Sequence, residues 1–119
     1  MKKTLVLGAS DKPQRYSYLA VKKLRGHGHT VVAVGRKNTA IDDVEIVTGM
    51  QGHTDIDTVT LYLNPTNQKP YYDSILSLQP KRIIFNPGSE NPELEALAKS
   101  KGIETLEACT LVMLATSRY

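Results

Sequence analysis

The segment Gly8–Ser17 combines small residues, hydroxyl side chains and an arginine just before a stretch with helical periodicity. It follows the apolar run Thr4–Leu7, which predicts a short buried strand, and it leads into a predicted helix at Tyr16–Gly26. Free backbone N–H groups at a helix N-terminus, together with the helix dipole, favour a bound anion. The segment therefore predicts a phosphate-binding turn, with the candidate residues Gly8, Ala9, Ser10, Arg15 and Ser17.

This turn departs from the G-x-G-x-x-G pattern of dinucleotide-binding turns. Ser10 and Pro13 stand where that pattern has its second and third glycines, so the backbone cannot approach a pyrophosphate as closely. Side-chain hydrogen bonds from Ser10, Arg15 and Ser17 would compensate, and a guanidinium suits bidentate contact with phosphate. The alternative is that Arg15 and Ser17 only cap the helix.

Two cations, Arg36 and Lys37, come shortly after the predicted strand Thr30–Val34. Enzymes that bind NAD place an acidic residue at the end of this strand, where it holds the ribose hydroxyls. Two cations there suit a ligand with an additional phosphate on its adenosine ribose, which NADP and coenzyme A both carry. Position alone does not separate these two ligands, and a solvated basic turn is the alternative without a ligand.

Two later strands each end in Asn-Pro, at Asn64-Pro65 and at Asn86-Pro87-Gly88. Proline and the residue before it favour an extended backbone, which would carry the chain over the sheet edge. Gly88 permits a positive φ and the close approach of a ligand. We expect the asparagine amides to hydrogen-bond peptide-like groups of a ligand. The alternative is that these residues only shape turns.

No side chains in the sequence have the arrangement of a nucleophile, a base and an orienting group, so we expect no catalytic residues. His27 and His29 flank Gly28 without a carboxylate or cysteine at metal-ligand spacing, so we expect no metal site. Cys109 is interpreted as a small buried residue, because no histidine is near it in the sequence.

The chain has 119 residues, of which 40% are hydrophobic and 23% charged, as in one globular domain spanning residues 1–119. Its net charge of +3 is small and dispersed, which is not the pattern of a nucleic-acid-binding protein. The apolar run before Gly8 is too short for a signal peptide or a membrane span. The single cysteine, Cys109, fits a reducing compartment. We therefore expect a cytoplasmic protein that binds neither nucleic acid nor membranes.

Strand and helix patterns alternate along the chain, and strands joined by crossover helices form parallel sheets. The sequence therefore predicts an α/β fold with a single doubly wound, mostly parallel sheet and helices on both faces. Ligands of such sheets bind at the carboxyl ends of the strands, where the strand order reverses. The expected strands are Thr4–Leu7, Thr30–Val34, a short edge strand at Val44–Val47, Thr58–Leu63, Arg82–Phe85 and Ile103–Glu107, and the expected helices are Tyr16–Gly26, Lys69–Leu78, Asn91–Lys101 and Thr110–Thr116.

Two motifs in a fixed order span most of the chain: Gly8-Ala9-Ser10 with Pro13, Arg15 and Ser17, and later Phe85–Asn91 followed by Cys109–Leu114. In these motifs the sequence resembles the small stand-alone CoA-binding domain proteins, which are similar to the N-terminal domain of the succinyl-CoA synthetase α subunit. The resemblance implies a Rossmann-type domain that holds coenzyme A across the strand ends. Relatives often carry Asn-Pro-Lys where this chain has Gly35-Arg36-Lys37.

The resemblance also implies how the ligand lies. The diphosphate would sit over Ser10, Arg15 and Ser17, and the adenosine 3′-phosphate near Arg36 and Lys37. The pantetheine arm would run past Tyr62, Asn64 and Pro65 toward Asn86, Pro87 and Gly88.

We therefore expect the protein to bind coenzyme A or an acyl-CoA without catalysing a reaction, because the resemblance does not extend to the ligase's phosphorylated histidine. The alternative is a small NADP-dependent reductase or a redox-sensing nucleotide-binding protein. A third interpretation is an interaction module whose contact surface includes the tyrosine pairs Tyr16/Tyr18 and Tyr71/Tyr72. A protein partner or a homodimer is compatible with each interpretation.

Overall fold

The computed structural model describes residues 1–119 and contains one sheet of seven strands. The strands are β1 (Thr4–Ala9), β2 (Val31–Gly35), β3 (Thr39–Ile41), β4 (Val44–Val47), β5 (Thr58–Leu61), β6 (Arg82–Phe85) and β7 (Glu104–Glu107). Their order is β3-β4-β2-β1-β5-β6-β7, and all neighbours are parallel except β3 and β4. Strands β2, β4 and β3 lie on one side of β1, and β5, β6 and β7 follow on the other side, as in doubly wound sheets. This confirms the predicted fold class.

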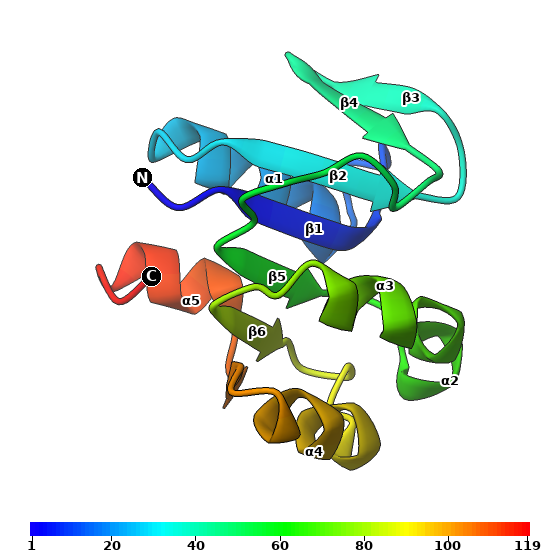
Figure 1. Ribbon diagram of the computed structural model, residues 1–119. Coiled ribbons are helices and arrows are strands. Elements are labelled where there is room, and N and C mark those ends of the chain that lie inside the picture. The colour runs from blue at the N-terminus through cyan, green and yellow to red at the C-terminus, as the bar shows by residue number, and fades with distance from the viewer.

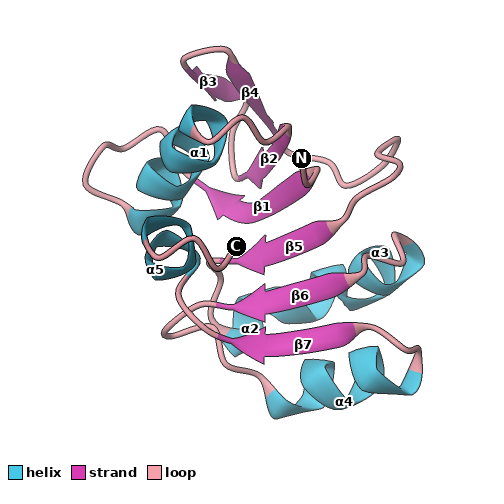
Figure 2. Cartoon of the chain, turned by 90° about the vertical axis from the view of Figure 1, so that its left-hand side faces the viewer, coloured by secondary structure: helices cyan, strands magenta, loops and turns pink.

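The helices are α1 (Tyr16–Gly26), α2 (Pro65–Gln68), the 3₁₀ turn η1 (Lys69–Tyr71), α3 (Tyr72–Ser77), α4 (Pro92–Ser100) and α5 (Thr110–Ala115). They cover both faces of the sheet (Figures 1 and 2). Alternate side chains of β1 explain this, because Leu5 packs in one core cluster with Leu94 of α4, while Val6 packs in a second with Val21 of α1 and Leu114 of α5. None of the helices combines the length and the apolar character needed to cross a membrane.

The strand predicted at the sheet edge, Val44–Val47, is β4 and lies inside the sheet between β2 and β3. The edge is β3, which pairs antiparallel with β4 across a turn at Asp42 and Asp43. Asp42 adopts a φ of +51°, a left-handed conformation that aspartate tolerates in tight turns. The prediction that Val44–Val47 forms the sheet edge is therefore wrong. The sequence did not indicate β3, because its hairpin with β4 lacks the glycine that usually marks a hairpin turn.

The helix predicted at Lys69–Leu78 begins earlier, at Pro65, and consists of α2, η1 and α3 in succession. Asn64 caps α2 by accepting a hydrogen bond from the backbone N–H of Asn67, and Pro65 occupies the first helical position. The strand before it ends at Leu61 instead of Leu63. Asn64-Pro65 therefore starts a helix and does not carry an extended chain over the sheet edge.

Candidate functional site

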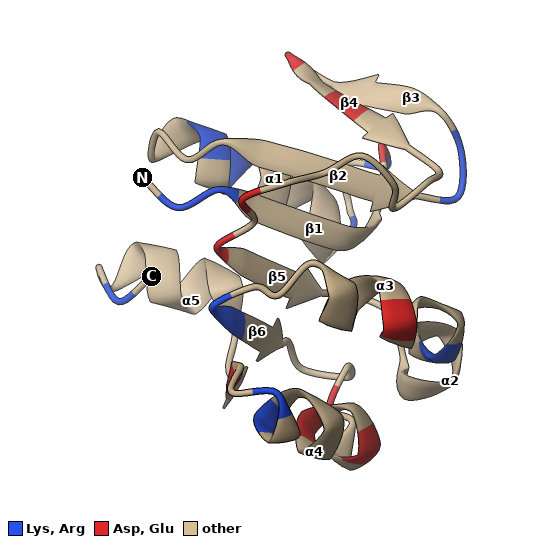
Figure 3. Cartoon of the chain, in the orientation of Figure 1, with Lys and Arg blue, Asp and Glu red and all other residues tan.

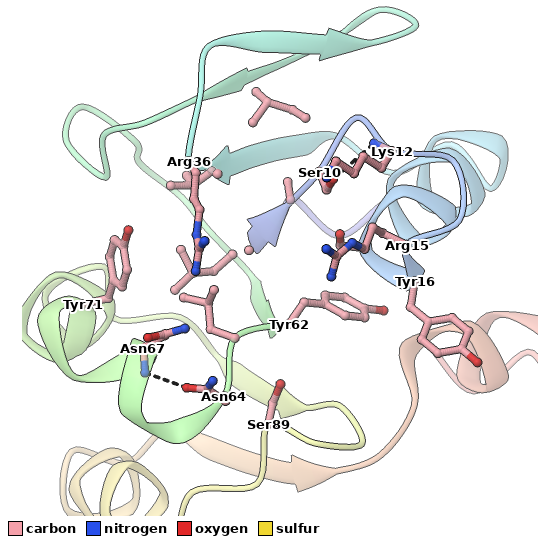
Figure 4. Close-up of a pocket in the computed structure, with 18 of the residues that line it drawn as sticks. Ser10, Lys12, Arg15, Tyr16, Arg36, Tyr62, Asn64, Asn67, Tyr71 and Ser89 are labelled. Carbon is pink, nitrogen blue, oxygen red and sulfur yellow. Dashed lines mark hydrogen bonds between the residues drawn. The ribbon is translucent and has the colours of Figure 1, made fainter.

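A cavity of about 1020 Å³ opens at the carboxyl ends of the parallel strands. Its walls come from the loops that follow β1, β2, β5 and β6, so it spans the point where the strand order reverses. Its volume is just above the roughly 300–1,000 Å³ that is usual for small-molecule sites. Figure 4 shows Arg15 and Arg36 pointing into this space from different walls.

Two glycines shape the floor of the cavity. At Gly35 a Cβ atom would lie 2.3 Å from the carbonyl oxygen of Ala9, so only glycine allows the ends of β1 and β2 to approach this closely. Gly8 has a φ of +94°, and the register of β1 against β2 shifts between Leu7 and Ala9. This bulge places Ala9 in the same core cluster as Val6 and leads the chain out of the sheet toward α1.

Arg15 lies immediately before α1, where a polar side chain would cap the helix. It makes no side-chain capping bond, so the structure does not give Arg15 the capping role that the sequence left open. Its side chain is exposed, lines the cavity and forms no ion pair. Ser17, in the first turn of α1, is buried against the same cavity. The N-terminus of α1 and an uncompensated guanidinium thus face one space.

Cations dominate the upper part of the cavity in Figure 4. Arg36 and Lys37, directly after β2, and Lys12, in the loop after β1, line it together with Arg15. Asp11 is the only acidic residue on the walls. The Nζ of Lys37 lies 3.5 Å from the Oδ2 of Asp11, whereas Arg36 has no carboxylate partner. The net positive charge suits a ligand that carries several phosphates.

The loop after β5 forms the lower wall. The ring of Tyr62 lies between the β1–α1 loop and this wall in Figure 4. Burial, helped by the nearby Cys109, raises the pKa of Tyr62, so its phenol remains neutral at physiological pH. Asn64 and Asn67, from the start of α2, add amide groups next to it. This wall is therefore uncharged, polar and partly aromatic.

Asn86 does not reach the cavity. It is 2% exposed, and its amide nitrogen donates to the Oγ1 of Thr60 at 2.6 Å and to the carbonyl oxygen of Leu61 at 2.9 Å. Its amide oxygen accepts from the backbone N–H of Thr110 at 2.8 Å. Because these bonds tie β5, β6 and α5 together inside the protein, the Asn86 amide is not available to a ligand. Pro65 also lies outside the cavity lining, as the first residue of α2.

The structure brings the other predicted residues together around the cavity. They are Gly8, Ala9, Ser10, Arg15, Ser17, Arg36, Lys37, Tyr62, Asn64, Pro87 and Gly88. Further lining residues were not named as candidates, although most of them lie in the predicted phosphate-binding segment Gly8–Ser17 or in the helical segment that starts at Pro65. The N-cap and first-position signature of Asn64-Pro65 would have located those in the helical segment. The missed residues include Asp11, Lys12, Tyr16, Thr39, Thr66, Asn67, Pro70, Tyr71 and Ser89.

The histidines lie elsewhere. His27 and His29 follow α1 at the amino end of the sheet, away from the cavity, and His29 accepts a hydrogen bond from the backbone N–H of Lys2. No three His, Cys, Asp or Glu side chains gather at metal-binding distance. Cys109 is half-buried at the start of α5.

Several solved structures share this fold. One, described only as an uncharacterized protein, is 50% identical in sequence, with 100% of this chain and 98% of that chain covered and a TM-score of 0.97. The cell-free ID.343 protein from Thermus thermophilus is 23% identical, with 99% and 90% covered and a TM-score of 0.87. A hypothetical protein from Pyrococcus horikoshii OT3 is also 23% identical, with 97% and 82% covered and a TM-score of 0.88.

Comparison with curated proteins found no match. Comparison with protein families found one that is described as a CoA binding domain, which matches residues 2–115. This match covers almost the whole chain and includes every loop that lines the cavity. The protein therefore belongs to the CoA binding domain family, as the resemblance in its sequence indicated.

Proposed function

We propose that residues 1–119 form one domain that binds coenzyme A or an acyl-CoA in the cavity and catalyses no reaction of its own. The observation that carries this proposal is the convergence of Arg15 and Arg36, which have no carboxylate partner and come from two separate loops, on one cavity at the carboxyl edge of the sheet. Coenzyme A has phosphates at two places, the diphosphate and the 3′ position of the ribose. Two cationic regions in one cavity match that distribution of charge.

In the proposed arrangement the diphosphate lies at the N-terminus of α1, near Ser10 and Arg15. Backbone N–H groups and a guanidinium are the donors that phosphate oxygens prefer. The 3′-phosphate lies near Arg36. The uncharged pantetheine arm extends along the polar wall, with Tyr62, Asn64, Pro87 and Gly88 as its candidate contacts.

Family membership supports coenzyme A over NADP, whose 2′-phosphate the same cations would suit. We also propose a cytoplasmic location, which the single cysteine favours. A protein partner or a homodimer is compatible with this function, since the bound ligand would fill only the carboxyl edge of the sheet.

Thermal unfolding with coenzyme A, dephospho-CoA, NADP and NAD tests the proposal. A ligand at a hundredfold excess over its Kd should add about 2.7 kcal/mol to the free energy of unfolding. We expect coenzyme A to raise the Tm most, dephospho-CoA less, and NAD least. A shift with NADP alone would overturn the proposal in favour of an NADP-dependent protein, and no shift with any of the four would favour an interaction module.

A further inference from the structure

Asp11 places a carboxylate among four cations that line the cavity. Its Oδ2 accepts a hydrogen bond from the Oγ1 of Thr39 at 3.0 Å and lies 3.5 Å from the Nζ of Lys37. Asp11 belongs to the loop after β1, whereas Lys37 belongs to the turn between β2 and β3 and Thr39 is the first residue of β3. One carboxylate oxygen therefore joins the two loops that carry the cations.

The carboxylate is ionised throughout the physiological range. The hydrogen bond from Thr39, together with the positive charge of Lys37, lowers the pKa of Asp11. A phosphate placed beside Lys37 would meet this negative charge as well. Lys37 is thus partly compensated before any ligand arrives, while Arg36, the residue next to it, has no carboxylate partner.

The two contacts of Asp11 can be separated experimentally. Asparagine has the same shape and keeps an amide oxygen that can accept from Thr39, but it has no charge to offer Lys37. Asp11→Asn therefore removes the charge and preserves the link between the loops. This makes the electrostatic contribution measurable without opening the cavity.

We propose that Asp11 is a specificity-determining residue that withholds Lys37 from the ligand, so that Arg36 alone recognises the phosphate on the adenosine ribose. The proposal rests on the proposed function. In it, Asp11 places one repulsive charge in a site that otherwise attracts phosphates. Asp11 thereby limits how strongly the protein prefers coenzyme A, which carries the 3′-phosphate, over dephospho-CoA, which does not.

Calorimetric titration of coenzyme A and dephospho-CoA into the wild type, Asp11→Asn, Lys37→Met and the double variant tests this. We expect Asp11→Asn to bind coenzyme A about two- to fivefold more tightly, the range of an exposed ion pair, with a smaller gain for dephospho-CoA. Lys37→Met leaves the Asp11 carboxylate without its cation beside the phosphate, so it should weaken coenzyme A binding by about two- to fivefold. The double variant should regain wild-type affinity, because neither charge of the pair remains and Arg36 is unchanged.

Asp42→Asn is the matched control, because Asp42 pairs with Lys22 at 3.2 Å outside the cavity and the substitution changes net charge equally. It should leave both affinities unchanged. Equal gains for both ligands in Asp11→Asn, no gain, or weaker binding would each overturn the role of Asp11. A double variant that binds as weakly as Lys37→Met would also overturn it, because Lys37 would then contact the ligand directly. Absence of coenzyme A binding by the wild type would instead refute the proposed function and the inference with it.

Discussion

Basic residues lie at both ends of the sheet (Figure 3), but the arginines at the two ends have different surroundings. At the carboxyl end, Arg15 and Arg36 are exposed, line a cavity and have no carboxylate partner. At the amino end, Arg82 is 8% exposed, donates from Nε to the Oγ1 of Thr58 at 2.8 Å, and stacks its guanidinium 4.4 Å from the ring centroid of Tyr119. The same residue type is therefore part of the core at one end and available to a ligand at the other.

What distinguishes the two ends is the set of groups around each guanidinium. Thr58 of β5 accepts a hydrogen bond from the Nε of Arg82, and the ring of Tyr119, after α5, packs against the guanidinium, although the buried Nη2 has no hydrogen-bond partner. Removal of Arg82 would therefore take a charged hydrogen bond and a buried packing contact from the protein. The cations of the cavity lie on loops beyond the strand ends, where their side chains are exposed and only Lys37 has a carboxylate partner. Mutations at the two ends should therefore separate effects on folding from effects on binding.

The largest effect is expected at the amino end. Arg82→Ala removes a charged hydrogen bond and the ring contact and leaves a cavity, so the free energy of unfolding should fall by roughly 3 kcal/mol. Denaturant unfolding measures the loss, and titration of the folded fraction should give the wild-type affinity for coenzyme A. If the Arg82→Ala protein kept wild-type stability, or if its affinity for coenzyme A fell by as much as its free energy of unfolding, the distinction between the two ends would be removed.

Arg15→Ala should show the reverse pattern. Loss of a charge-assisted contact to the diphosphate should weaken coenzyme A binding by about 1.5–3 kcal/mol, while the stability of the free protein should stay within about 0.5 kcal/mol. The control is Lys23→Ala, because Lys23 is an exposed cation on α1 that does not line the cavity. Unchanged affinity in a folded Arg15→Ala protein would remove Arg15 from the site.

Arg36→Ala should have a smaller and more selective effect. We expect coenzyme A binding to weaken by about 1 kcal/mol, as for an exposed ion pair, and dephospho-CoA binding to change little. Titration with both ligands measures the difference. If both affinities fall equally, Arg36 contributes only general positive charge and does not recognise the 3′-phosphate.

The smallest effect concerns pH and the amino end. Burial, and then the charges of Lys2 and neighbouring cations, lower the pKa of His29 from its ordinary 6.5. The folded protein then binds this proton less readily than the unfolded chain, so the free energy of unfolding should fall as the pH drops below about 6.5. Unfolding of the wild type and His29→Gln between about pH 7.5 and pH 5.5 measures this contribution, with His27→Gln as the control. Parallel curves for the wild type and His29→Gln would contradict it.

Local patterns predicted most of the fold. The alternation of apolar runs with helical stretches identified β1, β2, β5, β6 and the helices α1, α4 and α5, because each has a strong local signal. The hairpin of β3 and β4 was only half recognised, since β3 has three residues and its turn has no glycine. The start of α2 was missed because Asn-Pro is compatible with both an extended turn and a capped helix.

The candidate site was predictable where it depends on the topology and was missed where it depends on distant partners. Loops at the carboxyl ends of parallel strands must meet at one edge, so Arg15 and Arg36 could be placed in one cavity from the sequence. Asn64 and Asn86 look alike in the sequence, yet only Asn64 lines the cavity. The difference arises from bonds of Asn86 to Thr60 and Thr110, each more than twenty positions away along the chain.

Nuclear magnetic resonance of the labelled protein during titration with coenzyme A tests the central claim most directly. We predict that backbone amide signals shift at the strand ends, in the non-proline residues of 8–17, 35–37, 62–71 and 88–89, the segments whose residues line the cavity. The signals of Arg82, Tyr119 and His29, at the opposite end, should stay in place. Shifts concentrated at the amino end, or scattered over unrelated faces, would contradict a coenzyme A site at the carboxyl edge of the sheet.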